Sequence, residues 1–390
     1  MITVADALAR LFTLVSPLGP EEVPLRQANG RVLARDVKAA RNQPPFAASA
    51  MDGYAVAAQA IKAGQHFDVI GEAAAGHKWE GGVGPGQAVR IFTGAPLPDG
   101  TDHVIIQENV TRNGDVITLD DSPSDNAYVR PAGADFRTGD IIEAPRLLAP
   151  SDIALLAAMN IATVPVTRRP VVAIIATGDE LVQPGETPGE DQIIASNSYG
   201  LAALVENLGA HARLLPIARD NTASLELAFD LAADADLIVT IGGASVGDHD
   251  LVGDVAQAKG MQRSFYKVAM RPGKPLMAGR IGKAAMIGLP GNPVSAMVCG
   301  HVFLAPVIRK MLGRSADPAP REVLPLAKNI AANGPREHYM RAHAGPEGVT
   351  IFDRQDSALL TVLADADCLA VRPVHDPART AGDMIEIIRL

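Results

Sequence analysis

The feature that most constrains the fold is an alternation of short apolar runs and longer amphipathic segments across residues 171–241. The apolar runs have the length and composition of buried strands, and the segments between them have helical periodicity. In chain order they are VVAIIA (171–176), SNSYGLAALVENLG (196–209), ARLLPI (212–217), TASLELAFDLAAD (222–234) and DLIVTI (236–241). A β-α-β-α-β order predicts a parallel sheet with helices on both faces, which is a three-layer α/β domain.

Two further helices are predicted before this domain. Residues 3–15 place apolar side chains on one face, with Thr3 and Asp6 as a capping pair. Residues 151–160 follow a β-rich stretch and have Ser151 as a candidate N-cap. We therefore expect the chain to leave a helical region, form a β insertion and return.

Short alternating runs predict β structure in the insertion and again near the C-terminus. In the insertion, Asn113 and Gly114 would take the two positive φ values of a tight hairpin turn. The last residues predict a small β barrel or sandwich. The predicted organisation is 1–43 with 139–168 as a helical and extended linker, 44–138 as the inserted β domain, 169–317 as the α/β domain and 318–390 as the C-terminal β domain.

Composition excludes several classes of protein. The formal net charge of −9 disfavours a nucleic-acid partner. Cys299 and Cys368 lie far apart in apolar runs, so a disulfide framework or a CxxC metal site is not expected. The N-terminus lacks the pattern of a signal peptide, and the apolar stretch 294–308 is shorter than a membrane span and predicts a core helix. We expect a cytoplasmic protein with no membrane partner.

Acidic side chains follow all three predicted strands. They are Asp179 and Glu180, then Asp220, then Asp248 and Asp250. The carboxyl ends of parallel strands meet at one edge of a sheet, where ligands bind. A single loop acid is usually only solvated, but acids at three successive strand ends favour a hard cation such as Mg²⁺, which binds carboxylates together with phosphate.

Glycines and cationic side chains accompany these acids. Gly242 and Gly243 would let backbone N–H groups approach an anion, although an ordinary tight turn has the same signature. Lys267, Arg271 and Lys274 surround a Pro-Gly turn, and their charges suit an oxyanion.

The stretch GLPGNPVS (288–295) is a stiff turn that opens a helix. Pro293 suits a first helical turn, and the helix start favours an anion with Ser295 near the mouth of the site. An ordinary capped core helix is the alternative. Acids and bases together in Gly/Pro-rich loops indicate metal and phosphate or oxyanion chemistry.

Seven stretches together resemble one family, the molybdopterin molybdenumtransferases (MoeA), to which the C-terminal domain of gephyrin is also similar. They are SAMDGYAV (49–56), IFTGAPLP (91–98), ATGDEL, SNS, GGASVGDHD, RPGKP and GLPGNPVS, in the family's order. The resemblance covers almost the whole chain. It implies a multi-domain α/β plus β fold, with a central molybdopterin-binding domain, an inserted β domain and a C-terminal barrel-like β domain.

The resemblance also implies a reaction. Molybdate is joined to the dithiolene of adenylylated molybdopterin, and Mg²⁺-dependent cleavage of the pyrophosphate link releases AMP. It implies a homodimer, with residues 1–43 and 139–168 in the dimerisation region and each insertion completing the partner's active site. Other molybdenum cofactor biosynthesis proteins are possible partners.

Site residues carried over from the resemblance fall into three sets. The catalytic set is Asp52, Thr93, Asp135, Glu180, Asp220, Asp250 and Lys267. The set that binds the cofactor and molybdate is Gly242, Gly243, Ser245, Arg271, Lys274, Pro275, Ser295, Arg341 and Ser357. The Mg²⁺ ligands are Glu180, Asp220 and Asp250. Arg341 and Ser357 lie in loosely matching segments, and Ala47 and Ala48 stand where the family often has an acid before SAMDGYAV.

Two other functions compete with this one. A molybdopterin adenylyltransferase has the fold of the central domain alone, and the flanking β modules argue against it. A non-catalytic pterin-binding scaffold is disfavoured by the acids at all three strand ends.

Overall fold

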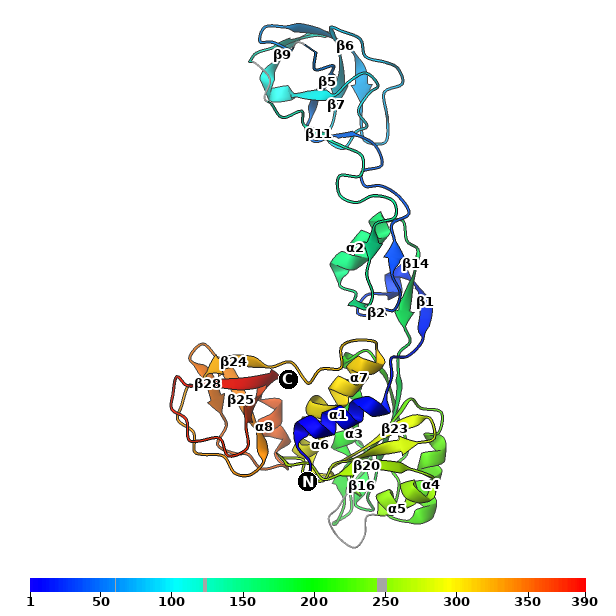
Figure 1. Ribbon diagram of the computed structural model, residues 1–390, viewed down its shortest axis with the longest axis vertical. Coiled ribbons are helices and arrows are strands. Elements are labelled where there is room, and N and C mark those ends of the chain that lie inside the picture. The colour runs from blue at the N-terminus through cyan, green and yellow to red at the C-terminus, as the bar shows by residue number, and fades with distance from the viewer. Residues whose placement is uncertain (60, 122–124, 244–250) are drawn as a thin grey trace. The chain divides into compact units, whose positions relative to one another are not determined.

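The computed structural model describes residues 1–59, 61–121, 125–243 and 251–390, which Figure 1 colours along the chain. The chain divides into two compact units. One comprises Met1–Glu21, Gly30–Ala34 and Val166–Leu390, and the other comprises Glu22–Asn29 and Arg35–Pro165. The β insertion predicted at 44–138 belongs to the second unit, and the predicted α/β and C-terminal β regions belong to the first.

The first unit is built on a six-stranded sheet. Its strands are β15 Val171–Ala176, β18 His211–Leu214, β19 Leu237–Ile241, β20 Gln262–Tyr266, β22 Met277–Ile281 and β23 Ala284–Leu289, in the order β18-β15-β19-β23-β22-β20. The first four in this order are parallel, which confirms the predicted arrangement of β15, β18 and β19. β22 and β20 add an antiparallel edge that the sequence reasoning did not predict.

Helices cover both faces of this sheet. They are α1 Val4–Leu14, α3 Ser196–Asn207, α4 Thr222–Leu231, α5 Leu251–Ala258, α6 Pro293–Cys299 and α7 Ala305–Met311. Val172 and Ile174 of β15 belong to a core with α1, α3, α6 and α7. Ala173 and Ile175 belong to a second core with α4 and α5. Burial of both faces explains the uninterrupted apolar run of β15, and the predicted three-layer α/β fold is confirmed.

Helix ends follow local chemistry. The Thr3 hydroxyl accepts a hydrogen bond from the Asp6 N–H at 3.0 Å, which confirms the predicted cap of α1. Gly209 takes φ +90° beyond α3, as a stop signal requires. The prediction that Ser151 caps α2 is wrong, because α2 (Pro150–Ala158) begins one residue earlier. Proline suits the first helical position, and the Asp152 carboxylate accepts from the backbone N–H that precedes the helix at 2.8 Å.

The predicted core helix at 294–308 is longer than its apolar run. Together with the π-helical η3 (Gly300–Leu304), α6 and α7 form a continuous 19-residue helix from Pro293 to Met311. Its length and composition would allow it to cross a membrane, but 78 % of its most apolar window is buried inside the protein. This burial is typical of a core helix.

The second unit contains a six-stranded sheet in the order β8-β5-β7-β6-β10-β9. The strands are β5 Gly53–Val56, β6 His66–Ala73, β7 Gln87–Ile91, β8 His103–Ile106, β9 Val110–Asn113 and β10 Val116–Leu119. The hairpin predicted at Asn113 and Gly114 is present, but only Gly114 has positive φ, at +62°. Asn113 pairs with Val116 as part of the ladder, so the two turn residues are Gly114 and Asp115. Glycine at the first central position is typical of a type II′ turn.

The C-terminal residues form a sheet in the order β21-β25-β27-β28-β24, and β26 pairs with β25. The strands are β21 Met270–Arg271, β24 Glu322–Pro325, β25 Glu337–Gly345, β26 Gly348–Ile351, β27 Cys368–Arg372 and β28 Met384–Arg389, and α8 is Leu360–Ala364. β21 comes from the loop that carries the predicted cationic residues, and it pairs in parallel with the start of β25. The predicted C-terminal β structure is therefore attached to that loop.

Short elements complete the chain. They are β1 Pro20–Pro24, η1 Leu25–Gln27, β2 Val32–Leu33, β3 Val37–Lys38, β4 Ala48–Ser49, η2 Gln107–Asn109, β11 Val129–Arg130, β12 Ile141–Ile142, β13 Arg146–Leu147, β14 Thr163–Thr167, β16 Leu181–Val182 and β17 Ile193–Ile194. Cys299 and Cys368 are buried and free, as predicted.

A buried ion network fixes the end of β27. Arg372 is 2 % exposed, and its guanidinium donates to the carboxylate of Asp376, which is 6 % exposed. Arg379 donates to both oxygens of the same carboxylate, at 2.9 and 2.8 Å. Burial raises the pKa of Asp376, but the hydrogen bonds from Arg379 and Arg372 outweigh it and hold that pKa below its ordinary value.

We predict that Asp376→Asn lowers the free energy of opening of the C-terminal sheet by about 3–5 kcal/mol, because it leaves the buried Arg372 charge uncompensated. Hydrogen exchange of the β25 and β27 amides measures this energy. Because the folded pKa of Asp376 is depressed, the stabilisation is present above the unfolded pKa of about 4 and is lost as the pH falls through the folded pKa. The difference between wild type and variant should therefore shrink in acid.

The matched control is Glu322→Gln, which breaks an ion pair with Arg389 whose side chains are 52 % and 46 % exposed. An exposed pair of this kind contributes less than about 1 kcal/mol. Equal losses in the two variants would contradict the importance of the buried network.

Candidate functional site

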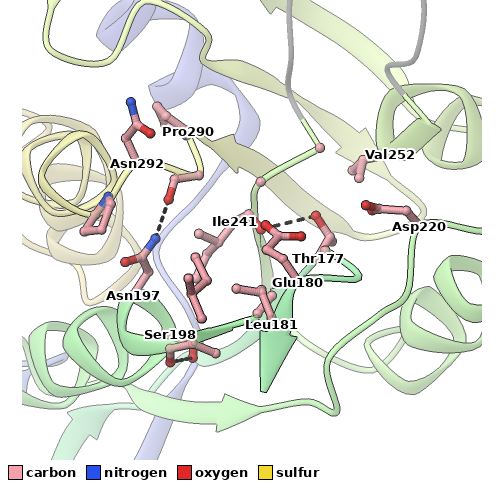
Figure 2. A pocket seen from close by; sticks show the side chains of 18 of the residues that line it. Thr177, Glu180, Leu181, Asn197, Ser198, Asp220, Ile241, Val252, Pro290 and Asn292 are labelled. Atoms are coloured by element: carbon pink, nitrogen blue, oxygen red, sulfur yellow. Dashed lines mark hydrogen bonds between the residues drawn. The ribbon is translucent and has the colours of Figure 1, made fainter. Parts of the chain in front are cut away.

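A cavity of about 960 Å³ lies at the carboxyl ends of the parallel strands. Thr177 and Glu180 line it from the loop after β15, and Asp220 from the loop after β18 (Figure 2). Gly242 lines it from the loop after β19. The strand order reverses between β15 and β19, because the chain continues from β15 to β18 on one side and from β19 to β20 on the other. Parallel α/β sheets bind their ligands at such a point.

Two of the predicted acids face this cavity. Glu180 and Asp220 both line it. Asp179 has a supporting role, because its carboxylate accepts a hydrogen bond from the backbone N–H of Asp220 at 3.1 Å. Asp254 of α5 also lines the cavity and was missed, since it lies within a helix rather than at a strand end.

The two acidic loops are joined by Arg219, which sequence reasoning also missed. Its guanidinium donates to the backbone carbonyls of Asp179 and Leu181, at 2.9 and 3.2 Å. Gly178 allows the Glu180 carboxylate to lie over the backbone, because a Cβ at residue 178 would come within 2.4 Å of a Glu180 oxygen. In the sequence, Arg219 directly precedes the predicted site residue Asp220, and this position could have indicated its role.

Both glycines after β19 are required by close backbone approach. Gly242 has φ +92°, and a Cβ there would lie 2.9 Å from the Thr177 carbonyl. Gly243 has φ +64°, and a Cβ there would lie 2.2 Å from a methyl group of Val252. The Gly242 N–H donates to the Leu289 carbonyl at 3.1 Å, so the expectation that this amide binds an anion is wrong. Its partner belongs to β23, which the sequence reasoning did not predict.

Asparagine side chains organise the opposite end of the cavity. Asn197 donates to the Gly291 carbonyl at 2.6 Å, and Asn292 donates to the Ser357 hydroxyl at 2.9 Å. The Val294 N–H, at the start of α6, donates to the Ser357 carbonyl at 3.0 Å. Ser357 therefore joins the C-terminal residues to the helix that borders the cavity. The SNS and GLPGNPVS motifs contain both asparagines, but their partners are distant in sequence.

The cationic loop lies beside this end of the cavity. Pro275 lines the cavity, and Lys274 directly precedes it. Arg271 is exposed on β21. Lys267 takes φ +70°, uncommon for a residue with a side chain, and its ammonium lies 4.9 Å from the centre of the neighbouring tyrosine ring. Ser295 is only 4 % exposed and does not line the cavity, so the expectation that it lies at the mouth is wrong.

Arg341 is a fully buried cation with unused donors. It is 0 % exposed, and one terminal nitrogen donates to the carbonyls of Asp356 and Arg354 at 2.8 and 3.3 Å. Its Nε and other terminal nitrogen have no hydrogen-bond partner within the described residues, and the same holds for Nε2 of the buried His338. Burial, then the charge of Arg271, lowers the pKa of His338 to about 4. Unpaired buried donors of this kind favour an anion nearby.

The remaining predicted catalytic residues lie in the second unit. Both the backbone N–H and the hydroxyl of Thr93 donate to one carboxylate oxygen of Asp52, at 2.7 and 2.8 Å. These hydrogen bonds lower the pKa of Asp52. The two residues meet because Gly53 of β5 pairs with Ile91 of β7. Asp135 is exposed in a loop of the same unit.

Two of the predicted site residues, Ser245 and Asp250, lie outside the described residues, as do Asp248 and His249. Among the residues that the structure does describe, no group of three His, Cys, Asp or Glu side chains is close enough to hold a metal ion. Glu180 and Asp220 are thus the two described members of the predicted Mg²⁺ set.

We predict that Gly243→Ala lowers the midpoint of thermal unfolding of the α/β region, because the new methyl group would overlap Val252. The matched control is Gly114→Ala, which has a similar φ of +62° but nothing within 4 Å of the added carbon. Both variants carry the strain of a positive φ, on the order of 1 kcal/mol. Calorimetry should show the larger loss for Gly243→Ala; equal losses would mean that backbone strain alone matters.

Three family descriptions match the chain in sequence order. They are "MoeA N-terminal region (domain I and II)" over residues 2–160, "Probable molybdopterin binding domain" over residues 173–310 and "MoeA C-terminal region (domain IV)" over residues 323–390.

Full-length relatives and a solved structure agree with these matches. The molybdopterin molybdenumtransferase of Haemophilus influenzae is 34 % identical, covering 99 % of this chain and 98 % of its own. That of Nostoc sp. is 34 % identical, covering 100 % and 94 %. A crystal structure of the molybdopterin biosynthesis MoeA protein from Pyrococcus horikoshii matches with a TM-score of 0.87 and 28 % identity, covering 100 % and 99 %. These likenesses, which span the whole chain, show that it belongs to the molybdopterin molybdenumtransferase (MoeA) family.

Proposed function

We propose that this protein inserts molybdate into adenylylated molybdopterin and releases AMP, which yields the molybdenum cofactor. The family membership supports this reaction. The observation that carries it is the chemistry of one cavity, with Glu180 and Asp220 at one end and the Asn292–Ser357 contact at the other. Such a cavity has carboxylates for a phosphate-bound cation and an opposite end, next to the buried Arg341, that suits an oxyanion.

Mg²⁺ fits the acidic end. Mg²⁺ is a hard cation that takes oxygen ligands and commonly binds one or two carboxylates together with substrate phosphate and water. Glu180 and Asp220 would hold it, with Asp250 as a further proposed ligand. When bound, Mg²⁺ would neutralise charge on the pyrophosphate link and on the departing phosphate. Arg219 and Asp179 keep the two acidic loops in position for this task.

Molybdate fits the opposite end. We propose that Arg271, Lys274, Arg341 and Ser357 hold it, with Lys267 adding positive charge. Ser357 presents a hydroxyl at the start of α6. Arg341 is fully buried behind this segment, where it donates to the Asp356 carbonyl and has two further donors without a partner within the described residues, so its contact with the oxyanion requires a local rearrangement. A planar guanidinium matches an oxyanion in two places at once.

We further propose a cytoplasmic homodimer in which Asp52, Thr93 and Asp135 of each chain complete the active site of the partner subunit. The support is that Asp52 and Thr93 form a hydrogen-bonded pair in the second unit, which also contains Asp135, whereas Glu180, Asp220 and Lys267 belong to the first. Proteins that deliver the adenylylated substrate or accept the product are further proposed partners.

The first test is AMP release from adenylylated molybdopterin, with and without molybdate and Mg²⁺. We predict that release requires both ions. Asp220→Asn should lower the rate on the order of 100-fold or more, because it removes a carboxylate that holds the cation. The control is Glu226→Gln, an exposed acid of α4 that does not line the cavity.

Three outcomes would contradict this function. Substrate binding without AMP release under any condition indicates a pterin-binding scaffold. Consumption of ATP without molybdate indicates an adenylyltransferase. An unchanged rate in Asp220→Asn would remove the acidic end of the cavity from the mechanism.

We also predict that Arg341→Gln raises the molybdate concentration needed for half-maximal AMP release by roughly 10- to 100-fold, since a hydrogen bond to a charged group contributes about 1.5–3 kcal/mol. The variant should fold, because it removes a buried charge of which two of the three nitrogens have no hydrogen-bond partner within the described residues. Arg389→Gln is the control, an arginine of the C-terminal sheet whose half-exposed side chain pairs with Glu322. A normal molybdate requirement in Arg341→Gln would show that Arg341 has only a structural role.

A further inference from the structure

A second pocket, of about 380 Å³, lies next to the cavity and has a different character. Helices α3, α6 and α8 and the π-helical η3 form it. Most of its lining is apolar, with Met297, Leu360 and Leu363 among the side chains. Its polar groups are few and come from Ser196, Asn197 and His301. Pockets for small organic molecules have this composition, an apolar wall with a few polar groups that orient the ligand.

The two pockets adjoin each other. Ser196 and Asn197 line both of them. Leu360, in the wall of the second pocket, follows Ser357 by three positions in the chain. Figure 2 shows Asn197 and Asn292 on one side of the cavity and Asp220 on the other. The second pocket therefore adjoins the end of the cavity where Asn197 and Asn292 lie, and not the acidic end.

Close helix packing builds this pocket. A Cβ at Gly200 of α3 would lie 2.9 Å from the Met297 sulfur, and a Cβ at Gly300 would lie 2.9 Å from a methyl group of Leu201. A single π-helical turn follows, and it carries His301 into the pocket wall. π-helical turns inside α-helices are rare and occur frequently at functional sites.

His301 suits recognition of a neutral heterocycle. Burial, then the charge of Arg309, lowers its pKa to about 4. At neutral pH the imidazole is therefore uncharged, with one nitrogen that donates and one that accepts a hydrogen bond. The Ser196 hydroxyl and the Asn197 amide add further donors and acceptors at the mouth.

We propose that this second pocket binds the pterin ring system of the substrate, an inference that rests on the function proposed above. In molybdopterin the dithiolene is attached to the pterin ring system, so the pterin must lie near the end of the cavity that holds the oxyanion. The nucleotide part then extends toward Glu180 and Asp220. The faces of the planar ring pack against Met297, Leu360 and Leu363, and its polar edge meets Ser196, Asn197 and His301.

The test uses two separate probes, 6-hydroxymethylpterin and AMP, titrated into the full-length protein and followed by pterin fluorescence and by calorimetry. Ala364→Trp places a large side chain in the pocket from α8. It should weaken pterin binding by roughly tenfold or more and leave AMP binding unchanged. Thr361→Trp, on the same helix and outside the pocket, is the matched control and should bind both probes normally.

A second variant tests the polar edge. His301→Phe keeps a ring of similar shape but removes both hydrogen-bonding nitrogens, so it should weaken pterin binding and not AMP binding. Normal pterin binding by both variants, or no saturable pterin binding by the wild-type protein, would overturn the proposal. Loss of AMP binding in Ala364→Trp would also overturn it, because the pocket would then hold the adenine.

Failure of this proposal is distinguishable from failure of the proposed function. If the reaction is wrong, AMP release is absent, while the binding of the two probes and its response to Ala364→Trp remain measurable. If only the pterin pocket is wrong, AMP release persists in Ala364→Trp at the wild-type rate.

Discussion

The reversal of strand order between β15 and β19 is the constraint on which the site depends. The chain leaves these neighbouring strands in opposite directions, so the loops after them diverge and border the cavity. Glu180 and Gly242 border this space, and Asp220 joins them from β18. The strands are held by apolar cores on both faces of the sheet. The packing of these buried side chains, which are distant from the cavity, therefore fixes the positions of the acidic loops.

The α/β region is also joined to the C-terminal residues by hydrogen bonds at the start of α6. The first N–H groups of a helix have no partner within the helix, and at α6 one of them, that of Val294, is satisfied by the Ser357 carbonyl. The same segment accepts hydrogen bonds from Arg341. The end of the cavity proposed for the oxyanion is thus assembled from segments near residues 271, 292 and 357, each of which needs the others.

The sheet and its acids could be predicted because they rest on local patterns. Apolar runs indicate strands, and parallel topology then brings residues such as Glu180 and Asp220 together. Two of the errors arose where a distant partner decides the outcome. The Gly242 amide is used by a strand that was not predicted, and Ser295 is buried because α6 packs into the core. At the start of α2, the Asp152 carboxylate and not the neighbouring Ser151 hydroxyl accepts the backbone hydrogen bond. Both residue types are common at helix starts, so the sequence alone does not distinguish them.

The pairing of β21 with β25 has a consequence for how such proteins can be rearranged. Met270 and Arg271 form the outer strand beside Glu337 and His338, although they precede them by a long stretch of chain. A fragment excised near residue 318 would leave the backbone of Glu337 and His338 as an open sheet edge, which invites pairing with another chain. A chain in which the C-terminal segment alone is exchanged would therefore have to restore this strand pair.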